Sequence, residues 1–260
     1  DTCILFQWAA AKTWRDIRDS HRMGNSIPED SITDMLLLKM TRRSSRLVYK
    51  RFTPQCESKE SGADWLWWFV SERGNRAFPV LVQAKRLFPD QRYKSLKYRG
   101  TAADQTNVLL RYGKKHKFLP VFVFYNYWDN RQSWSTNWCW SDCEQWGCAV
   151  APATGVKRVL KTDNNGNRLD RLGPISLPWL VLVCPRRFGV YAGAQGDLPE
   201  RVRGVLKSPF KLRNVPEVVP TPEYVRQMLL RRDTAEESGP PDGLGFLKGV
   251  VAVSDRPLER

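Results

Sequence analysis

Three polar residues beside two apolar segments could together carry out chemistry on a phosphodiester. Asp64 opens a predicted strand over 64–70, and Gln83 and Lys85 follow a second predicted strand over 79–82. A Gly-Asn pair lies between the segments and predicts a turn, so we expect one hairpin. Such a hairpin would bring a carboxylate, an amide oxygen and an ammonium group together at its open end.

These residue types suit a divalent metal ion. Carboxylate and carbonyl oxygens are the ligands that Mg²⁺ prefers, so we expect Asp64, the side-chain oxygen of Gln83 and the backbone carbonyl of Ala84 to bind it, with Mn²⁺ as the alternative. The metal would polarise the scissile phosphate and acidify its bound water. Lys85 would position or deprotonate that water and stabilise the charge that develops. Alone, Lys85 would pass for one more surface cation.

A further carboxylate is expected from the helix that starts after Pro28. The segment Glu-Asp-Ser-Ile-Thr-Asp opens that helix, and we choose Glu29 as the catalytic acid and metal ligand, with Asp30 and Asp34 as substitutes. A first-turn acid is also stabilised by the helix dipole alone, which is the non-catalytic explanation of Glu29.

Together these motifs resemble the PD-(D/E)XK restriction-endonuclease-like nuclease superfamily, and specifically a bacterial family of unknown function with Glu…GADW…QAK motifs. The similarity spans 27–184. It also includes the segments Gln-Thr-Asn-Val-Leu-Leu at 105–110, Pro-Val-Phe-Val-Phe-Tyr-Asn at 120–126, Trp-Gly-Cys-Ala at 146–149 and Pro178-Trp179.

The resemblance implies a role for each matching residue. Glu29 corresponds to the helix acid, Asp64 to the acid of the second motif, and Gln83 and Lys85 to the paired polar and lysine positions. Gln105 corresponds to a supporting helix glutamine. Gln83 stands where a second carboxylate often lies, which removes one negative charge from the expected metal site and puts metal affinity in doubt.

The expected function is therefore that of a Mg²⁺-dependent endonuclease acting on DNA, in a bacterial anti-phage defence setting that the resemblance implies. Two alternatives stay open. One is a catalytically inactive nucleic-acid-binding module with a degenerate nuclease site, and the other is a ribonuclease that uses the same site. A homodimer would suit double-strand cutting, although no residue indicates one.

The order of predicted elements indicates an α/β fold. A helix, three strands, a helix over 102–117 and a strand over 120–125 fit a mixed central sheet flanked by helices. We expect a restriction-endonuclease-like nuclease domain over 1–196, with its core at about 27–126 and a tryptophan-rich insertion at about 127–178. We interpret 197–260, with many prolines, glycines and arginines, as a basic C-terminal appendage.

The net charge and the distribution of charged and apolar residues indicate which binding partners and which cellular compartment to expect. A formal net charge of +15 favours nucleic acid, because a positive surface field attracts polyanions. The basic residues are dispersed rather than aligned on one amphipathic helix, which argues against a membrane partner. No leader or transmembrane stretch is evident, so we expect a soluble cytoplasmic protein with reduced thiols.

Other residues that could carry chemistry have stronger structural explanations. Cys139, Cys143 and Cys148 could bind zinc only with a fourth ligand, and buried free thiols are the better interpretation. His21 and His116 are too far apart in the sequence to support a histidine-based nuclease. The tryptophans between 128 and 146 could stack on bases, but core packing is the preferred interpretation.

Overall fold

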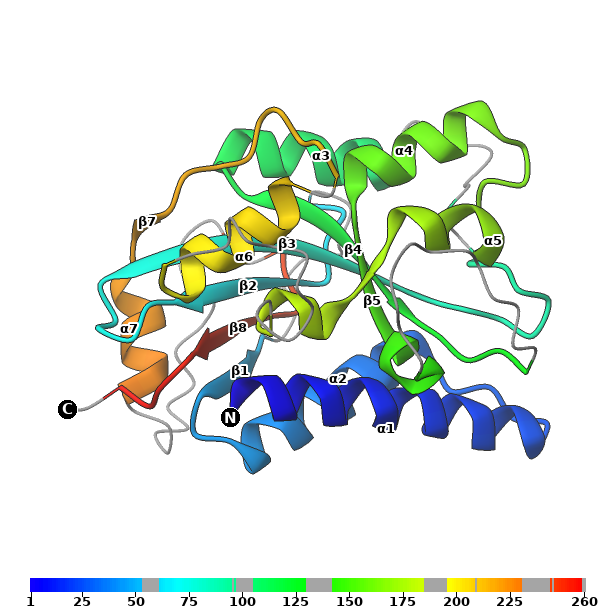
Figure 1. The fold of residues 1–260 in the computed structure, drawn as a ribbon, viewed down its shortest axis with the longest axis horizontal. Coiled ribbons are helices and arrows are strands. Elements are labelled where there is room, and N and C mark those ends of the chain that lie inside the picture. The colour runs from blue at the N-terminus through cyan, green and yellow to red at the C-terminus, as the bar shows by residue number, and fades with distance from the viewer. Residues whose placement is uncertain are drawn as a thin grey trace.

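The protein is described here by a computed structural model that covers residues 1–52, 61–94, 96, 105–129, 142–184, 196–208, 210–230, 244 and 246–258. Within these ranges it is a mixed α/β protein with one open sheet (Figure 1). The strands are β1 Leu47–Arg51, β2 Trp65–Val70, β3 Arg76–Arg86, β4 Leu119–Tyr125, β5 Cys148–Pro152, β6 Leu177–Pro178, β7 Val219–Pro220 and β8 Gly249–Ser254. The α-helices are α1 Thr2–Arg22, α2 Glu29–Arg43, α3 Gln105–His116, α4 Ala153–Thr162, α5 Leu169–Leu172, α6 Leu198–Lys207 and α7 Glu223–Leu230.

The sheet has the order β1-β8-β2-β3-β4-β5-β6, and β7 pairs with the start of β3. The predicted hairpin of β2 and β3 lies at its centre, with Trp65 opposite Val82 and Val70 opposite Ala77. The β2–β8 and β3–β4 pairs are parallel, whereas the other pairs along this order are antiparallel. This mixed sheet confirms the predicted α/β class.

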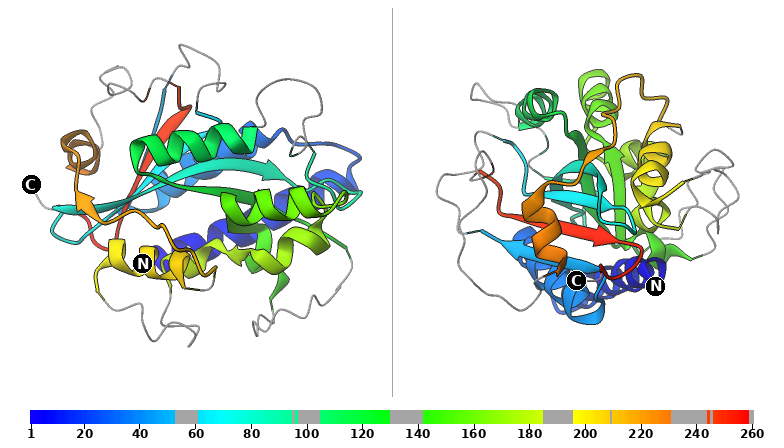
Figure 2. Two further views of the ribbon diagram at one scale, coloured as in Figure 1. Left: turned by 90° about the horizontal axis from the view of Figure 1, so that it is seen from above. Right: turned by 90° about the vertical axis from the view of Figure 1, so that its left-hand side faces the viewer.

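Helices cover both sides of the sheet. Figure 1 shows α1 and α2 side by side below the strands and α3 and α4 above them, and the end-on view of Figure 2 shows the sheet between these layers. Strands covered on both faces should be apolar throughout rather than alternating. All six residues of β2 are indeed buried.

Aromatic side chains fill much of the core on both faces of β2. Trp67 packs against Phe6 of α1 and against Trp179, with ring centroids 6.2 Å and 5.6 Å away. On the other face, Trp68 donates a hydrogen bond of 2.8 Å to the hydroxyl of Tyr224 in α7. Successive side chains of a strand point to opposite faces, so one strand anchors helices on both sides.

Two segments that we predicted as decorations supply strands of the sheet. The expected insertion at 127–178 contributes β5 and β6, which extend the sheet beyond β4. The expected appendage at 197–260 contributes β8, which lies between β1 and β2 (Figure 1). At least this strand of the C-terminal segment therefore belongs to the core, because a central strand pairs with two neighbours.

The apolar run over 179–184 predicts one more buried strand, and this prediction is wrong. Residues Trp179–Leu182 form a 3-10 helix, η3, and all four are buried. A short, fully apolar run has no alternation to separate a strand from a buried helical turn, so periodicity could not decide.

The expectation of reduced thiols is also wrong for one pair. Cys3 and Cys184 form a disulfide, with their Cα atoms 5.2 Å apart, although the two residues are 181 positions apart in the sequence. Packing of α1 against η3 brings the two together, and sequence spacing could not reveal this. No helix in the described ranges is long and apolar enough to cross a membrane.

Candidate functional site

The candidate site lies where the central hairpin opens. The backbone N–H of Asp64 donates to the carbonyl of Val82 at 2.8 Å, so Asp64 directly precedes β2 and lies beside the end of β3. Gln83 and Lys85 are two positions apart on β3, so they share one face of the sheet. The hairpin thus brings together the three residues that the sequence singled out.

Asp64 is fixed by three contacts. Its Oδ2 accepts hydrogen bonds from Gln83 Nε2 and from the backbone N–H of Ala84, both at 2.7 Å. Its Oδ1 forms an ion pair of 2.9 Å with Nζ of Lys248. The side chain is only 7% exposed, which is tolerated because hydrogen bonds and a cation compensate the buried charge.

Glu29 reaches the same end of β3 from the first turn of α2. Its Oε1 lies 3.3 Å from Nζ of Lys85, and its Oε2 accepts a hydrogen bond of 3.0 Å from the backbone N–H of Arg86. Burial raises the pKa of Glu29 to about 6; Lys85 opposes this shift and the charge of Asp64 adds to it. The two carboxylates therefore lie close enough to affect each other.

Gln105, the first residue of α3, holds the amide of Gln83. Gln105 Nε2 donates to Gln83 Oε1 at 2.8 Å, which leaves Gln83 Nε2 directed at Asp64. Gly62 permits this close approach of α3: its φ is +63°, and a Cβ there would lie 2.8 Å from the Gln105 carbonyl oxygen and 2.9 Å from the backbone nitrogen of Leu109. The glycine of the Gly-Ala-Asp motif thus has a packing role.

Lys248 is a site residue that the sequence interpretation missed. It immediately precedes β8, and its backbone N–H donates to the Asp64 carbonyl at 2.8 Å. Its ammonium group contacts Asp64 and also Asp30 Oδ1, at 2.6 Å. Although burial favours the neutral amine, these two carboxylates raise the pKa of Lys248 above its usual value. The apolar run after Lys248 was the available signal, because it is typical of a buried strand.

The site contains the oxygen types that a hard divalent cation prefers, although Gln83 presents its Nε2 and not its Oε1 to Asp64. No group of three or more His, Cys, Asp or Glu side chains suited to a metal occurs in the described part of the chain. A metal here would therefore use the carboxylates of Asp64 and Glu29 together with two uncharged oxygens, Gln83 Oε1 and the Ala84 carbonyl. Gln83 Oε1 accepts a hydrogen bond from Gln105 and the Ala84 carbonyl accepts one from Gln83, and each of these oxygens has a second lone pair.

Several predicted residues lie elsewhere. Asp34, a substitute for Glu29, instead accepts from the hydroxyl of Tyr49 and pairs with Arg51. Cys143 is an exposed free thiol and Cys148 a buried one. The prediction of a buried free thiol is therefore confirmed for Cys148 and wrong for Cys143, and Cys139 lies outside the described residues. Burial raises the pKa of the Cys148 thiol above its usual range.

The described tryptophans of the 128–146 segment pack into the protein. Trp128 is 9% exposed and meets Trp14 edge-on, with centroids 4.5 Å apart, and Trp146 is 7% exposed. Core packing is thus confirmed for these two, and the tryptophans between them lie outside the described residues.

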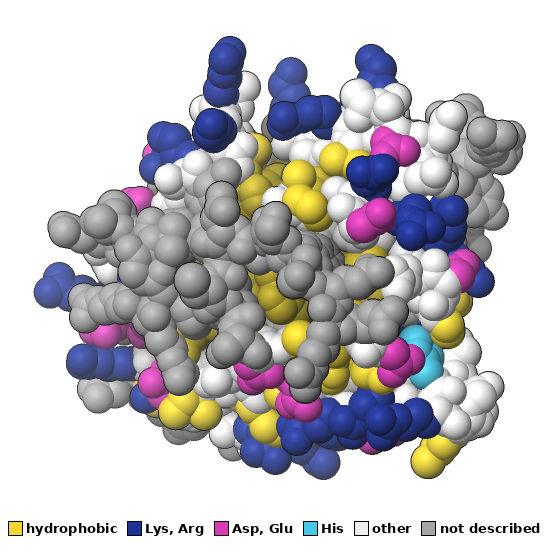
Figure 3. Space-filling model, turned by 45° about the vertical axis from the view of Figure 1, so that its right-hand side comes forward, with side chains coloured by type: hydrophobic (Ala, Val, Ile, Leu, Met, Phe, Trp, Pro, Cys, Tyr) yellow, Lys and Arg dark blue, Asp and Glu magenta, His cyan; other side chains and the backbone are white. Residues whose placement is uncertain are grey.

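On the face shown in Figure 3, Lys and Arg side chains form separate groups and a strip along the lower edge.

The model of one protein family matches nearly the whole chain, over residues 2–258. That family is described as a family of unknown function (DUF6615). No curated protein matches the chain.

Proposed function

Since the chain belongs to the DUF6615 family, whose function is unknown, we propose a function from its own residues: a metal-dependent nuclease that hydrolyses phosphodiester bonds in DNA. The resemblance of its motifs to the PD-(D/E)XK superfamily supports this proposal. We also propose, on that resemblance alone, a role in bacterial anti-phage defence.

One observation carries the proposal. Residues from four separate parts of the sequence meet at the open end of the hairpin: Glu29 with Lys85, and Asp64 with Gln83 and Lys248. Two carboxylates, an amide and two ammonium groups form two sets of contacts there, and both sets are held by the same end of β3. Charged residues that contribute only to solubility lie on the exposed surface, whereas most of these residues are buried together.

The chain's residues divide the work of phosphodiester hydrolysis. Mg²⁺ or Mn²⁺, when bound by Asp64, Glu29, Gln83 and the Ala84 carbonyl, supplies Lewis acidity at the phosphate and acidifies a water molecule. Lys85, whose side chain is 7% exposed and held by Glu29, donates to the attacking water and to the phosphate oxygens.

Lys248 has an electrostatic role. Its raised pKa keeps it protonated at neutral pH, so it cannot act as a general base. Its ammonium group instead stabilises the ionised form of Asp64 and adds positive charge where the phosphate would lie. This charge partly offsets the repulsion between a phosphate and the site's carboxylates.

The test is a cleavage assay on plasmid DNA and on RNA, with Mg²⁺, Mn²⁺ or EDTA. The wild-type protein should cut with either metal and not in EDTA, whereas Asp64→Ala and Lys85→Ala should lose at least ~100-fold in rate. Arg158→Gln, on the exposed side of α4, is the control and should cut like wild type. Cleavage by Asp64→Ala and Lys85→Ala at the wild-type rate would indicate a contaminating nuclease. It would remove the support for this site.

One observation favours a second function, that of an inactive nucleic-acid-binding module. Both site carboxylates already have a lysine partner within the protein, as a structural ion-pair network would. Metal-independent binding of DNA without cleavage, unchanged by Asp64→Ala, would identify this alternative. Cleavage of RNA alone would identify the ribonuclease.

A further inference from the structure

A second concave surface lies at the other end of the central hairpin. The turn Ser71–Asn75 joins β2 to β3 there, at the end opposite to Asp64 and Lys85. Two adjoining hollows of about 470 Å³ and 440 Å³ share Glu72 and Arg73 of this turn. Five arginines line the two hollows, and we call this surface the arginine groove: Arg73, Arg76, Arg201, Arg226 and Arg256.

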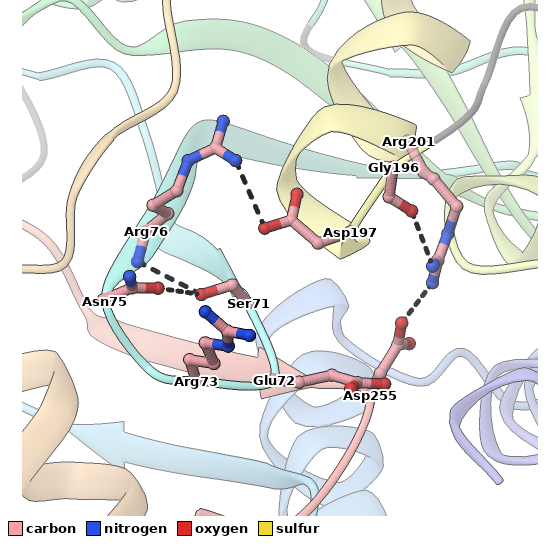
Figure 4. Close-up of a pocket in the computed structure, with 9 residues that line it drawn as sticks. All are labelled: Ser71, Glu72, Arg73, Asn75, Arg76, Gly196, Asp197, Arg201 and Asp255. Carbon is pink, nitrogen blue, oxygen red and sulfur yellow. Dashed lines mark hydrogen bonds and ion pairs between the residues drawn. The ribbon is translucent and has the colours of Figure 1, made fainter.

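The larger hollow is balanced in charge (Figure 4). Arg76 Nη1 lies 3.6 Å from Asp197, and Arg201 pairs with Asp255 and donates to the Gly196 carbonyl at 3.3 Å. Each of these two arginines therefore has a carboxylate partner. Ion pairs of this kind fix the walls of the hollow and leave little free charge in them.

The smaller hollow has an excess of positive charge. Arg73 comes from the turn, Arg226 from α7 and Arg256 from the segment after β8. Glu72 is the one carboxylate among the lining residues that the structure describes, and it lies 3.3 Å from Nε of Arg256. The side chains of Arg73 and Arg226 form no hydrogen bond or ion pair within the described residues. Like charges gathered on a concave surface raise the local potential and attract anions.

Apolar residues complete the wall of the smaller hollow. Leu230, Pro257 and Leu258 line it beside the arginines. A Cβ at Gly74 would lie 3.0 Å from Leu258 Cδ1, so the turn is packed closely against this wall. An apolar wall next to guanidinium groups suits a ligand with an oxyanion at one end and a ring at the other.

We propose that the arginine groove binds a nucleoside phosphate, separately from the candidate metal site. Guanidinium groups match phosphate oxygens in a fork geometry, and two of them here, Arg73 and Arg226, have no side-chain partner among the described residues. Arg73, Arg226 and Arg256 contact the phosphate, and the nucleoside lies against the apolar wall. The volumes are those of ordinary small-molecule sites. A free nucleotide and the 5′-phosphorylated end of a nucleic acid share this chemistry.

The test measures binding of ADP and of adenosine to the full chain by isothermal titration calorimetry in EDTA. ADP should bind and adenosine should bind at least ~10-fold more weakly, because the phosphate supplies the charge-assisted hydrogen bonds. The double variant Arg73→Gln/Arg226→Gln should lose ~10-fold or more in ADP affinity. Arg158→Gln, the same change at an exposed arginine of α4, should bind like wild type.

Further arms separate the sources and the two sites. Asp64→Ala should bind ADP normally, so failure of the nuclease proposal would leave this result unaffected. A 5′-phosphorylated trinucleotide that binds more tightly than ADP, and loses this affinity in the double variant, would identify a strand end as the ligand. Absence of ADP and trinucleotide binding to wild type, or equal binding by the double variant, would overturn the proposal.

Discussion

Replacing Lys248 with methionine removes the ammonium group that lies 2.9 Å from Asp64 Oδ1 and 2.6 Å from Asp30 Oδ1, while it keeps an unbranched side chain of similar length. The change tests whether the segment before β8 supplies a charge that the site depends on. It leaves the backbone hydrogen bond between Lys248 and Asp64 in place.

The expected size of the coupling free energy follows from the exposure of the Lys248 and Asp64 side chains. Removal of one member of a buried ion pair costs ~3–5 kcal/mol. The side chain of Asp64 is 7% exposed, but that of Lys248 is 32% exposed, so solvent screens part of the interaction. Asp64 also retains its hydrogen bonds from Gln83 and Ala84. We therefore expect a coupling free energy between Lys248 and Asp64 of about 1–2 kcal/mol.

A double-mutant cycle by urea denaturation measures this coupling. The four proteins are wild type, Lys248→Met, Asp64→Asn and the double variant. Their free energies of unfolding are compared at pH 7, and the comparison requires that the free energy depend equally on urea in all four. A parallel cycle with Asp30→Asn is the matched control. The Asp30 side chain is 60% exposed, so its coupling to Lys248 should stay below about 1 kcal/mol.

A coupling free energy between Lys248 and Asp64 of less than about 0.3 kcal/mol, the usual limit of additivity for independent sites, would refute the electrostatic role of Lys248. A stronger coupling of Lys248 to Asp30 than to Asp64 would also refute it. Either result would mean that Lys248 is a solvated surface cation and not part of the candidate site.

Three further predictions concern the site and the packing around it. The stability of wild type relative to Glu29→Gln should fall by about 2 kcal/mol as pH rises from about a unit below 4.5 to about a unit above 6, because the unfolded carboxyl ionises first; thermal melts at several pH values would measure this, and a constant difference would refute it. Gly147→Ala should cost about 3 kcal/mol, since its Cβ would overlap the backbone of α1, whereas Gly155→Ala, with room for a Cβ, should stabilise α4 by up to about 1 kcal/mol; equal effects of the two in urea denaturation would contradict the packing. Reduction of the disulfide between Cys3 and Cys184 should lower stability by about 2–4 kcal/mol, and the double serine variant should not respond to the reductant.

The local pattern of the sequence predicted most elements around the site. The hairpin of β2 and β3, the start of α2 at Glu29, the helix that Gln105 opens and the strand β4 all follow from residue type and spacing. Because these elements adjoin one another in the chain, Asp64 could be placed beside Gln83 before the structure was known. Only the family resemblance pointed to Gln105, and its contact with Gln83 is a finding of the structure.

Residues from the distant ends of the chain could not be placed in this way. Lys248 lies in the site because β8 pairs with both β1 and β2. The sequence of an apolar strand does not show which strands it pairs with. The disulfide between Cys3 and Cys184 depends likewise on how α1 packs against η3.

By itself, then, the sequence determined the residue types of the site, the hairpin that aligns Asp64 with Gln83 and Lys85, and the α/β class. Only the folded structure shows that a C-terminal strand completes the sheet, that Lys248 pairs with Asp64 and that five arginines from separate segments line one groove. The physical reason is that backbone periodicity reports on neighbours along the chain, whereas strand order and charge convergence depend on packing between segments far apart in it.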